Sequence, residues 1–67
     1  MKTVEMYPKT PKPKWLRVGA KVECLGEGRG CIFTVADVRS ETCSSMLLDE
    51  KGQVHGRESW SKLYLPG

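Results

Sequence analysis

Short segments in which apolar and polar residues alternate run along most of the chain, separated by glycines and polar turns. Residues 20–25 place Val22 and Cys24 on one face between charged neighbours, which is typical of a half-buried strand. Residues 31–39 are rich in β-branched side chains and include the only phenylalanine, Phe33. This composition predicts a second, longer strand.

The second strand cannot be regular if all its apolar residues are buried. Val35 and Val38 are separated by an odd number of positions, so they point to opposite faces of a regular strand. We therefore expect a bulge or bend near residues 36–37. Residues 46–49 and 54–58 are the third and fourth predicted strands.

The segments between the strands have the composition of turns. Residues 26–30 contain three glycines but match no phosphate-binding pattern, so they predict a loop. Residues 49–53 predict a tight hairpin built on a type I turn, with Gly52 in the left-handed conformation. Residues 59–63 are too few for an α-helix and predict one 3₁₀ turn, followed by a short last strand at residues 64–66.

The chain has 67 residues, which allows one small domain with a modest core. Its apolar positions, taken strand by strand, give twelve expected core residues. They are Val18, Val22, Cys24, Phe33, Val35, Val38, Met46, Leu48, Val54, Trp60, Leu63 and Leu65. Trp60 is the largest of them, and we expect the fold to depend on it.

The N-terminal segment differs in composition from the rest of the chain. Residues 1–14 contain Pro8, Pro11 and Pro13 among lysines, and proline favours extended backbone without strand pairing. We expect a flexible basic arm, with the folded domain at residues 15–67. The spacing of Pro8 and Pro11 also matches the PxxP pattern of proline-rich ligands, which is a common and unspecific match.

The predicted order of elements resembles the SH3-like barrel, including its KOW and Tudor-type variants. The resemblance covers residues 16–66 and is carried by the strand openings at residues 18–22 and 33–38 and by the turn at residues 59–63. It implies an all-β fold: a small five-stranded barrel with one short 3₁₀ turn, preceded by the arm. The glycine-rich signature of KOW domains is imperfect here, and the clustered aromatic residues of a Tudor-type cage are missing.

A second resemblance concerns the C-terminal part of the chain. Residues 54–63 look like the C-terminal part of small uncharacterised phage and prophage proteins. This resemblance implies an accessory protein of an infected or lysogenic bacterium, and it implies no known activity.

The net charge of +3 is unevenly distributed. Residues 1–17 hold five basic residues and one acidic residue, whereas residues 18–67 hold six basic and seven acidic residues. A basic arm can neutralise phosphates while Tyr7 or Trp15 stacks on bases, so nucleic-acid binding is one hypothesis. Its candidate residues are Lys9, Lys12, Lys14 and Arg17.

The residues that could carry chemistry are few. Cys24, Cys31 and Cys43 form no C-x2-C pair, so a zinc site built from them and His55 is an alternative that we do not favour. Cys24 and Cys31 fit small hydrophobic residues on strands, and Cys43 fits an exposed loop. His55 lies in no Ser/His/Asp-like context, and the carboxylates are expected to be dispersed and solvated. We therefore expect neither an enzyme nor a bound cofactor or metal.

A protein-interaction module is the function that these observations favour. Arginine, tryptophan and tyrosine are enriched in interface hot spots, so the candidate residues are Trp15, Arg29, Arg57 and Tyr64. The partner is unidentified, and the chain is expected to be a monomer or a weak homo-oligomer. It has neither a membrane-span-length apolar run nor the apolar segment of a secretory signal, and its odd number of cysteines favours a reducing compartment. We expect a cytoplasmic protein.

Overall fold

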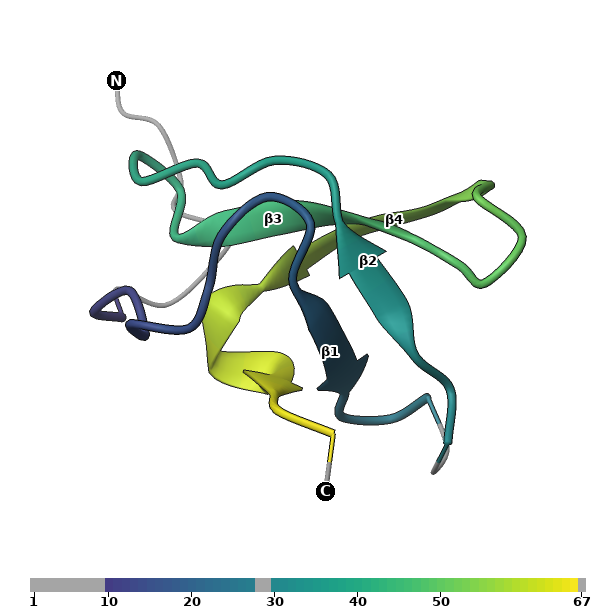
Figure 1. The fold of residues 1–67 in the computed structure, drawn as a ribbon. Coiled ribbons are helices and arrows are strands. Elements are labelled where there is room, and N and C mark those ends of the chain that lie inside the picture. The colour runs from purple at the N-terminus through teal and green to yellow at the C-terminus, as the bar shows by residue number, and fades with distance from the viewer. Residues whose placement is uncertain (1–9, 28–29, 67) are drawn as a thin grey trace.

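The computed structural model describes residues 10–27 and 30–66, and these residues form one antiparallel sheet. Its elements, in chain order, are β1 (Lys21–Cys24), β2 (Phe33–Val35), β3 (Ser44–Leu48), β4 (Val54–Ser59), the 3₁₀ turn η1 (Trp60–Lys62) and β5 (Leu63–Tyr64). The strands follow the order β4-β3-β2-β1-β5 (Figure 1). The predicted all-β class and single 3₁₀ turn are confirmed, and the pairing leaves β4 and β5 at the two ends of the sheet.

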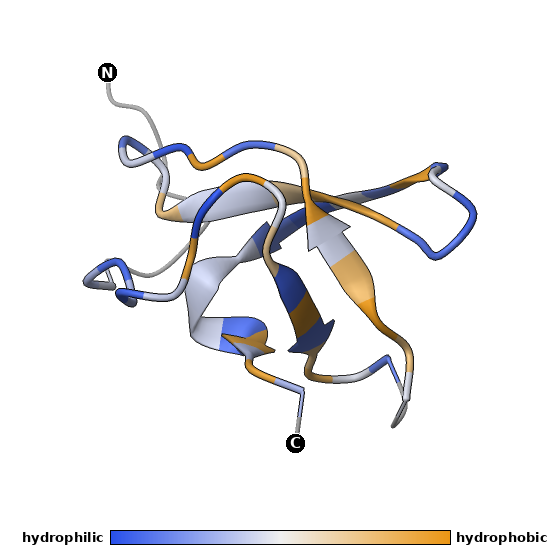
Figure 2. Ribbon diagram, viewed as in Figure 1, coloured by the Kyte–Doolittle hydropathy of each residue, from blue (hydrophilic) through white to orange (hydrophobic). Residues whose placement is uncertain are grey.

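The register between strands determines which residues form the core. Residues paired directly across antiparallel strands point to the same face of the sheet. Three such pairs are buried on one face: Val22 with Phe33, Val35 with Leu47, and Cys24 with Leu63. Leu16, which precedes the sheet, and Trp60 of η1 complete the core. The alternation is visible along β1 in Figure 2, where hydrophilic and hydrophobic residues follow one another.

Three of the twelve predicted core residues are exposed. The side chain of Val18 lies in the turn before β1 and is 64% exposed, and that of Leu65 lies after β5 and is 51% exposed. Val54 is 68% exposed because it pairs with Leu48 on the outer face. An apolar residue at the end of a strand is therefore not evidence of burial in so short a sheet.

The third strand also differs from its prediction. The sequence pattern places it at residues 46–49 with Met46 and Leu48 inward, but β3 begins earlier and buries Leu47 completely. Leu47 pairs with Val35, whose side chain is buried, so this register turns Leu47 inward and leaves its two neighbours half-buried. Ser44 and Ser45, which precede the predicted strand, are fully buried in β3.

The predicted bend after the second strand is present, and the strand is shorter than expected. β2 ends at Val35, and the Asp37 carboxylate accepts a hydrogen bond from the amide of Met46 at 2.8 Å. Val38 then packs, partly buried, against the core. Cys31, predicted on this strand, lies before it and is exposed.

The two predicted turns at residues 49–53 and 59–63 are confirmed. Asp49 accepts hydrogen bonds from the amides of Lys51 and Gln53, and Gly52 adopts the expected positive φ of 84°. At η1, the Ser59 hydroxyl accepts a hydrogen bond from the amide of Ser61, which caps the turn.

Strand β4 contains a bulge that the sequence pattern does not predict. Gly56 pairs with Leu47, but the next residue of β3, Leu48, pairs with Val54. His55 is therefore an extra residue on β4 without a partner across the ladder. Gly56 has a φ of 139°, a conformation that residues with a Cβ rarely adopt.

The N-terminal segment is described from Thr10 onward. The amide of Thr10 donates to the Cys43 sulfur at 3.5 Å, and Leu16 is fully buried. Residues 1–9 of the predicted arm, including Pro8 of the PxxP match, lie outside the described residues. Within the described ranges, no helix has the length and hydropathy needed to cross a membrane.

Replacement of Trp60 by alanine is expected to unfold the domain. Trp60 is 4% exposed, and its indole N–H donates to the Ser45 hydroxyl at 3.1 Å. Loss of a buried tryptophan costs about 3–5 kcal/mol, which is comparable to the whole stability of so small a domain. A two-dimensional NMR spectrum of Trp60→Ala should show an unfolded chain, with exposed Val18→Ala as the folded control. A folded Trp60→Ala spectrum would refute this assignment of the core.

The bulge gives a second prediction, for Gly56→Ala. A Cβ at Gly56 has no atom within 4 Å, so the substitution strains the backbone without a steric clash. We expect a loss of about 1–2 kcal/mol in the free energy of unfolding, measured by urea denaturation. Ala20→Gly, at a partly buried position before β1, is a control for an ordinary glycine–alanine difference. Equal stability of wild type and Gly56→Ala would show that the bulge is not constrained.

Candidate functional site

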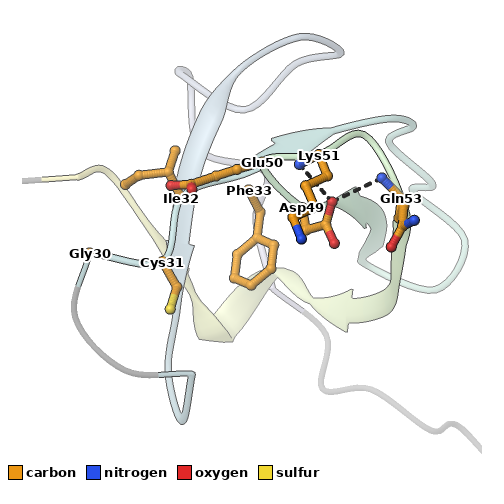
Figure 3. A pocket seen from close by; sticks show the side chains of 8 residues that line it. All are labelled: Gly30, Cys31, Ile32, Phe33, Asp49, Glu50, Lys51 and Gln53. Atoms are coloured by element: carbon orange, nitrogen blue, oxygen red, sulfur yellow. Dashed lines mark hydrogen bonds between the residues drawn. The ribbon is translucent and has the colours of Figure 1, made fainter.

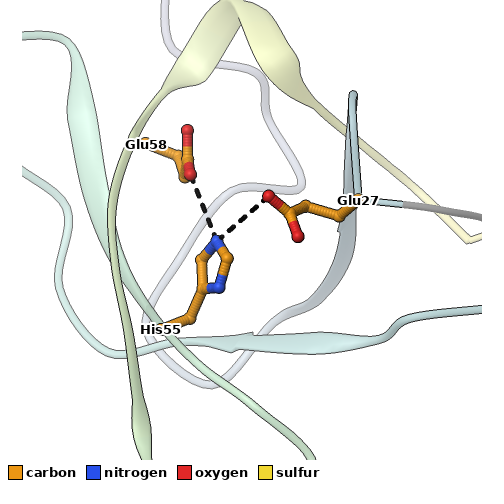
Figure 4. Close-up of side chains that lie close together, drawn as sticks. All are labelled: Glu27, His55 and Glu58. Atoms are coloured by element: carbon orange, nitrogen blue, oxygen red, sulfur yellow. Dashed lines mark hydrogen bonds and ion pairs between the residues drawn. The ribbon is translucent and has the colours of Figure 1, made fainter.

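Three ionisable side chains from segments far apart in the sequence converge in the structure. They are Glu27, which follows β1, and His55 and Glu58 of β4 (Figure 4). The Nε2 atom of His55 lies 3.1 Å from Oε2 of Glu58 and 3.7 Å from Oε2 of Glu27. The three side chains are between 20% and 38% exposed, so the cluster is partly buried and open to solvent.

The bulge in β4 brings His55 and Glu58 to the same side of the sheet. Residues three positions apart point to opposite faces of a regular strand, and the extra residue removes this alternation. Glu58 pairs with the buried Ser45 and so shares the inner face. The imidazole also lies against the ring of Phe33, with centroids 4.4 Å apart, which orients it toward the carboxylates.

Acidic groups dominate the electrostatics of the cluster. Lys62 Nζ lies 3.8 Å from Oε1 of Glu58, the oxygen that does not face His55. Burial, followed by the negative charges of Glu58 and Glu27, raises the pKa of the nearby Cys24 thiol to about 11. Cys24 is therefore protonated at neutral pH and is a poor nucleophile. One imidazole nitrogen and two carboxylate oxygens, all within 4.8 Å of one another, are instead a ligand set that could hold a cation.

An open pocket of about 340 Å³ lies between the start of β2 and the β3–β4 hairpin (Figure 3). Ile32 and Phe33 supply its large apolar side chains. The remaining lining comes from Gly30, Cys31, Asp49, Glu50, Lys51 and Gln53. Phe33 thus belongs both to the pocket wall and to the ring contact with His55.

Arg57, a predicted partner-binding residue, is already engaged within the fold. Its guanidinium donates to Oδ2 of Asp37 at 2.8 Å and to the Ser44 hydroxyl at 3.1 Å. The hydrogen bond from Arg57, followed by the one from the Met46 amide, lowers the pKa of Asp37. This network joins β4 to the segment after β2 and leaves Arg57 only 21% exposed.

The other predicted partner-binding residues are not gathered with Arg57. Trp15 is half-buried against the core, and Tyr64 lies on β5, at the other end of the strand order from β4. The Tyr64 hydroxyl donates to a carboxylate oxygen of Glu23 at 3.1 Å. Arg29 lies outside the described residues.

The predicted nucleic-acid residues are likewise in different environments. Lys12, Lys14 and Arg17 are all exposed, and Nζ of Lys12 donates to the carbonyl of Leu16 at 3.2 Å. Lys9, like Tyr7, lies outside the described residues. Three of the four predicted basic residues are thus exposed on the described surface, and two of them, Lys14 and Arg17, lie close to Trp15 in the sequence.

The sequence analysis missed the acidic cluster. The prediction that the carboxylates are dispersed and solvated is wrong for Glu27 and Glu58. His55 approaches both of these carboxylates. Of the three cysteines, Cys24 is buried, Cys43 is partly buried and Cys31 is exposed. The one available signal was Gly56 inside a strand pattern, because such a glycine often marks a bulge.

The raised pKa of Cys24 predicts how the stability of the fold changes at alkaline pH. Its folded-state pKa of about 11 exceeds the ordinary value of 9.0, so the folded chain binds this proton more tightly than the unfolded chain. The corresponding stability is present below pH 9 and is lost as the pH rises toward 11, by at most about 3 kcal/mol. Urea denaturation of wild type and Cys24→Ala at pH 7 and pH 10.5 measures this loss. Wild type should lose more stability than the variant, and equal losses would contradict the assignment.

Comparison of the chain with protein-family models, with curated proteins and with solved structures finds no match.

Proposed function

We propose that this chain is a small non-enzymatic binding module with an SH3-like architecture, which docks an extended segment of a partner protein. The SH3-like assignment is supported by the pairing of β1 with both β2 and β5 and by the 3₁₀ turn between β4 and β5. In this architecture the loops and strand edges around the sheet are available to a partner.

The pocket between β2 and the β3–β4 hairpin is the observation that carries the proposal. Ile32 and Phe33 provide apolar surface, and the hairpin residues Glu50 and Lys51 provide a charged rim (Figure 3). An apolar floor with a few polar groups around it is the usual composition of a ligand pocket. Its size suits one or two side chains of a peptide, and Phe33 is held in place by the core.

The neighbouring strand supports an extended ligand. β4 ends the strand order, so its outer edge has no paired strand among the described residues. Val54, at the start of β4 and next to the pocket residue Gln53, is 68% exposed. A peptide strand added along an open edge gains backbone hydrogen bonds, while its side chains fill adjacent pockets.

Nucleic-acid binding is the second candidate function. The exposed side chains of Lys14 and Arg17 lie on either side of half-buried Trp15 in the sequence. Cationic side chains beside an aromatic ring are the usual elements of a single-strand binding surface.

The pocket gives a testable prediction for Ile32→Ser. Peptides selected by display on the full chain are titrated into labelled protein, and NMR shift changes are expected at the pocket residues and along β4. Ile32→Ser removes an apolar contact and is expected to weaken binding about tenfold or more. Val18→Ser, exposed and outside the pocket lining, is the matched control. Shift changes elsewhere, or equal affinities of the two variants, would refute the docking site.

An oligonucleotide-binding experiment with the same protein distinguishes nucleic-acid binding from peptide docking. A fluorescent single-stranded oligonucleotide at about 50 mM salt should bind only if the arm contacts phosphates, because counterion release favours binding at low salt. Binding that is lost on replacing Lys14 and Arg17 by glutamate, with no peptide binding at the pocket, would favour nucleic acid over a protein partner.

A further inference from the structure

We propose that Glu27, His55 and Glu58 form a binding site for zinc or a similar divalent transition-metal ion. The ion would connect the segment after β1 to strand β4. The ligand atoms would be Nε2 of His55 and one carboxylate oxygen from each glutamate. This proposal concerns the acidic cluster alone and does not depend on peptide docking at the pocket.

The distances around His55 suit a shared cation better than hydrogen bonding alone. One N–H at Nε2 can serve Glu58 at 3.1 Å, but Oε2 of Glu27 is 3.7 Å away, beyond hydrogen-bond range. Zinc bonds of about 2.0–2.2 Å in a tetrahedral arrangement place two ligand atoms about 3.3–3.6 Å apart. The two distances from His55 lie on either side of this range, and all three ligand atoms lie within 4.8 Å of one another, so side-chain rotations that draw the two carboxylates together would complete the site.

The charge of the cluster also favours a cation. Two carboxylates face one imidazole nitrogen, and Lys62 is the one lysine or arginine of the described residues that pairs with either carboxylate. Lys62 contacts Oε1 of Glu58 at 3.8 Å and is 54% exposed, so it leaves Oε2 available. A divalent ion would neutralise the remaining negative charge at the point where the carboxylates converge.

The ligand types indicate which cation would bind. Calcium and magnesium prefer six or more oxygen ligands, whereas an imidazole nitrogen with carboxylate oxygens suits zinc and similar transition metals. Three protein ligands leave one tetrahedral position for water or for a side chain of a partner. The side-chain exposures of 20–38% allow an ion to enter from solvent.

The fold holds the central ligand in position before any ion binds. The bulge places His55 on the same side as Glu58, and Phe33 contacts the imidazole ring at a centroid distance of 4.4 Å. Ligands with fixed orientation lose little freedom on binding, which raises affinity. Glu27, which lies far from β4 in the sequence, is the ligand that the ion would restrain.

Cobalt and zinc titrations of the full chain test the site. Co²⁺ is expected to give a visible absorption spectrum of tetrahedral nitrogen–oxygen ligation, and zinc should displace it and shift the His55 ring signals in NMR spectra. Glu27→Gln is expected to lower zinc affinity at least tenfold while the fold is retained, because Glu27 follows β1 and contributes nothing to the core. Glu41→Gln, an exposed change in the turn before β3, is the matched control and should bind zinc like wild type.

The exposed thiol of Cys31 offers a competing zinc ligand, and a second variant distinguishes it. Cys31→Ser is expected to keep both the affinity and the cobalt spectrum. The proposal is overturned by any one of three results: no binding at millimolar zinc, equal affinities of Glu27→Gln and Glu41→Gln, or a thiolate–cobalt absorption band, which would show Cys24 or Cys31 as a ligand.

Discussion

The direction in which the side chains of β4 point depends on a single extra residue. The bulge at His55 determines which of them face inward. Val54 pairs outward with Leu48, and after the bulge Arg57 pairs with Met46 on the outer face. Without the extra residue, the part of β4 before the bulge or the part after it would shift by one position relative to β3. Every side chain in the shifted part would then change face. A shift of the part after the bulge would direct Arg57 toward the core and break its ion pair with Asp37.

The bulge thus separates two polar networks that lie on opposite faces of the sheet. On the outer face, Arg57 binds Asp37 and Ser44 and ties the bend after β2 to the β3–β4 hairpin. On the inner face, His55 meets Glu58 and Glu27 at the edge of the core. No buried side-chain nitrogen or oxygen in the described residues lacks a hydrogen-bond partner, so neither network leaves an uncompensated polar group in this small core.

Phe33 links the two features proposed to be functional. Its ring lines the pocket at the start of β2 and also contacts the imidazole of His55. A cation bound at the cluster would fix the imidazole, which contacts Phe33 of the pocket lining. The proposed docking of a peptide and the proposed binding of a cation are separate, but this shared aromatic residue gives them a physical means of influencing each other.

Local signals were enough to predict most of the elements. The alternation around Val22 and Cys24, the hairpin at residues 49–53 and the 3₁₀ turn near Trp60 depend on side-chain period and turn chemistry within a few residues, and all three are present. The bend at Asp37 was predicted as well, because Val38 otherwise has the wrong parity. These features follow from the amino-acid order because neighbouring residues alone produce them.

The burial of Leu47 and the meeting of Glu27 with His55 and Glu58 could not be predicted in this way. Leu47 and its two neighbours are all apolar, so only its pairing with Val35 selects the one that faces inward. Glu27 reaches His55 because β1 and β4 belong to one curved sheet, and Glu58 joins them because the bulge reverses its face. Each of these outcomes depends on register between distant strands, and a one-residue change in register is invisible to local periodicity.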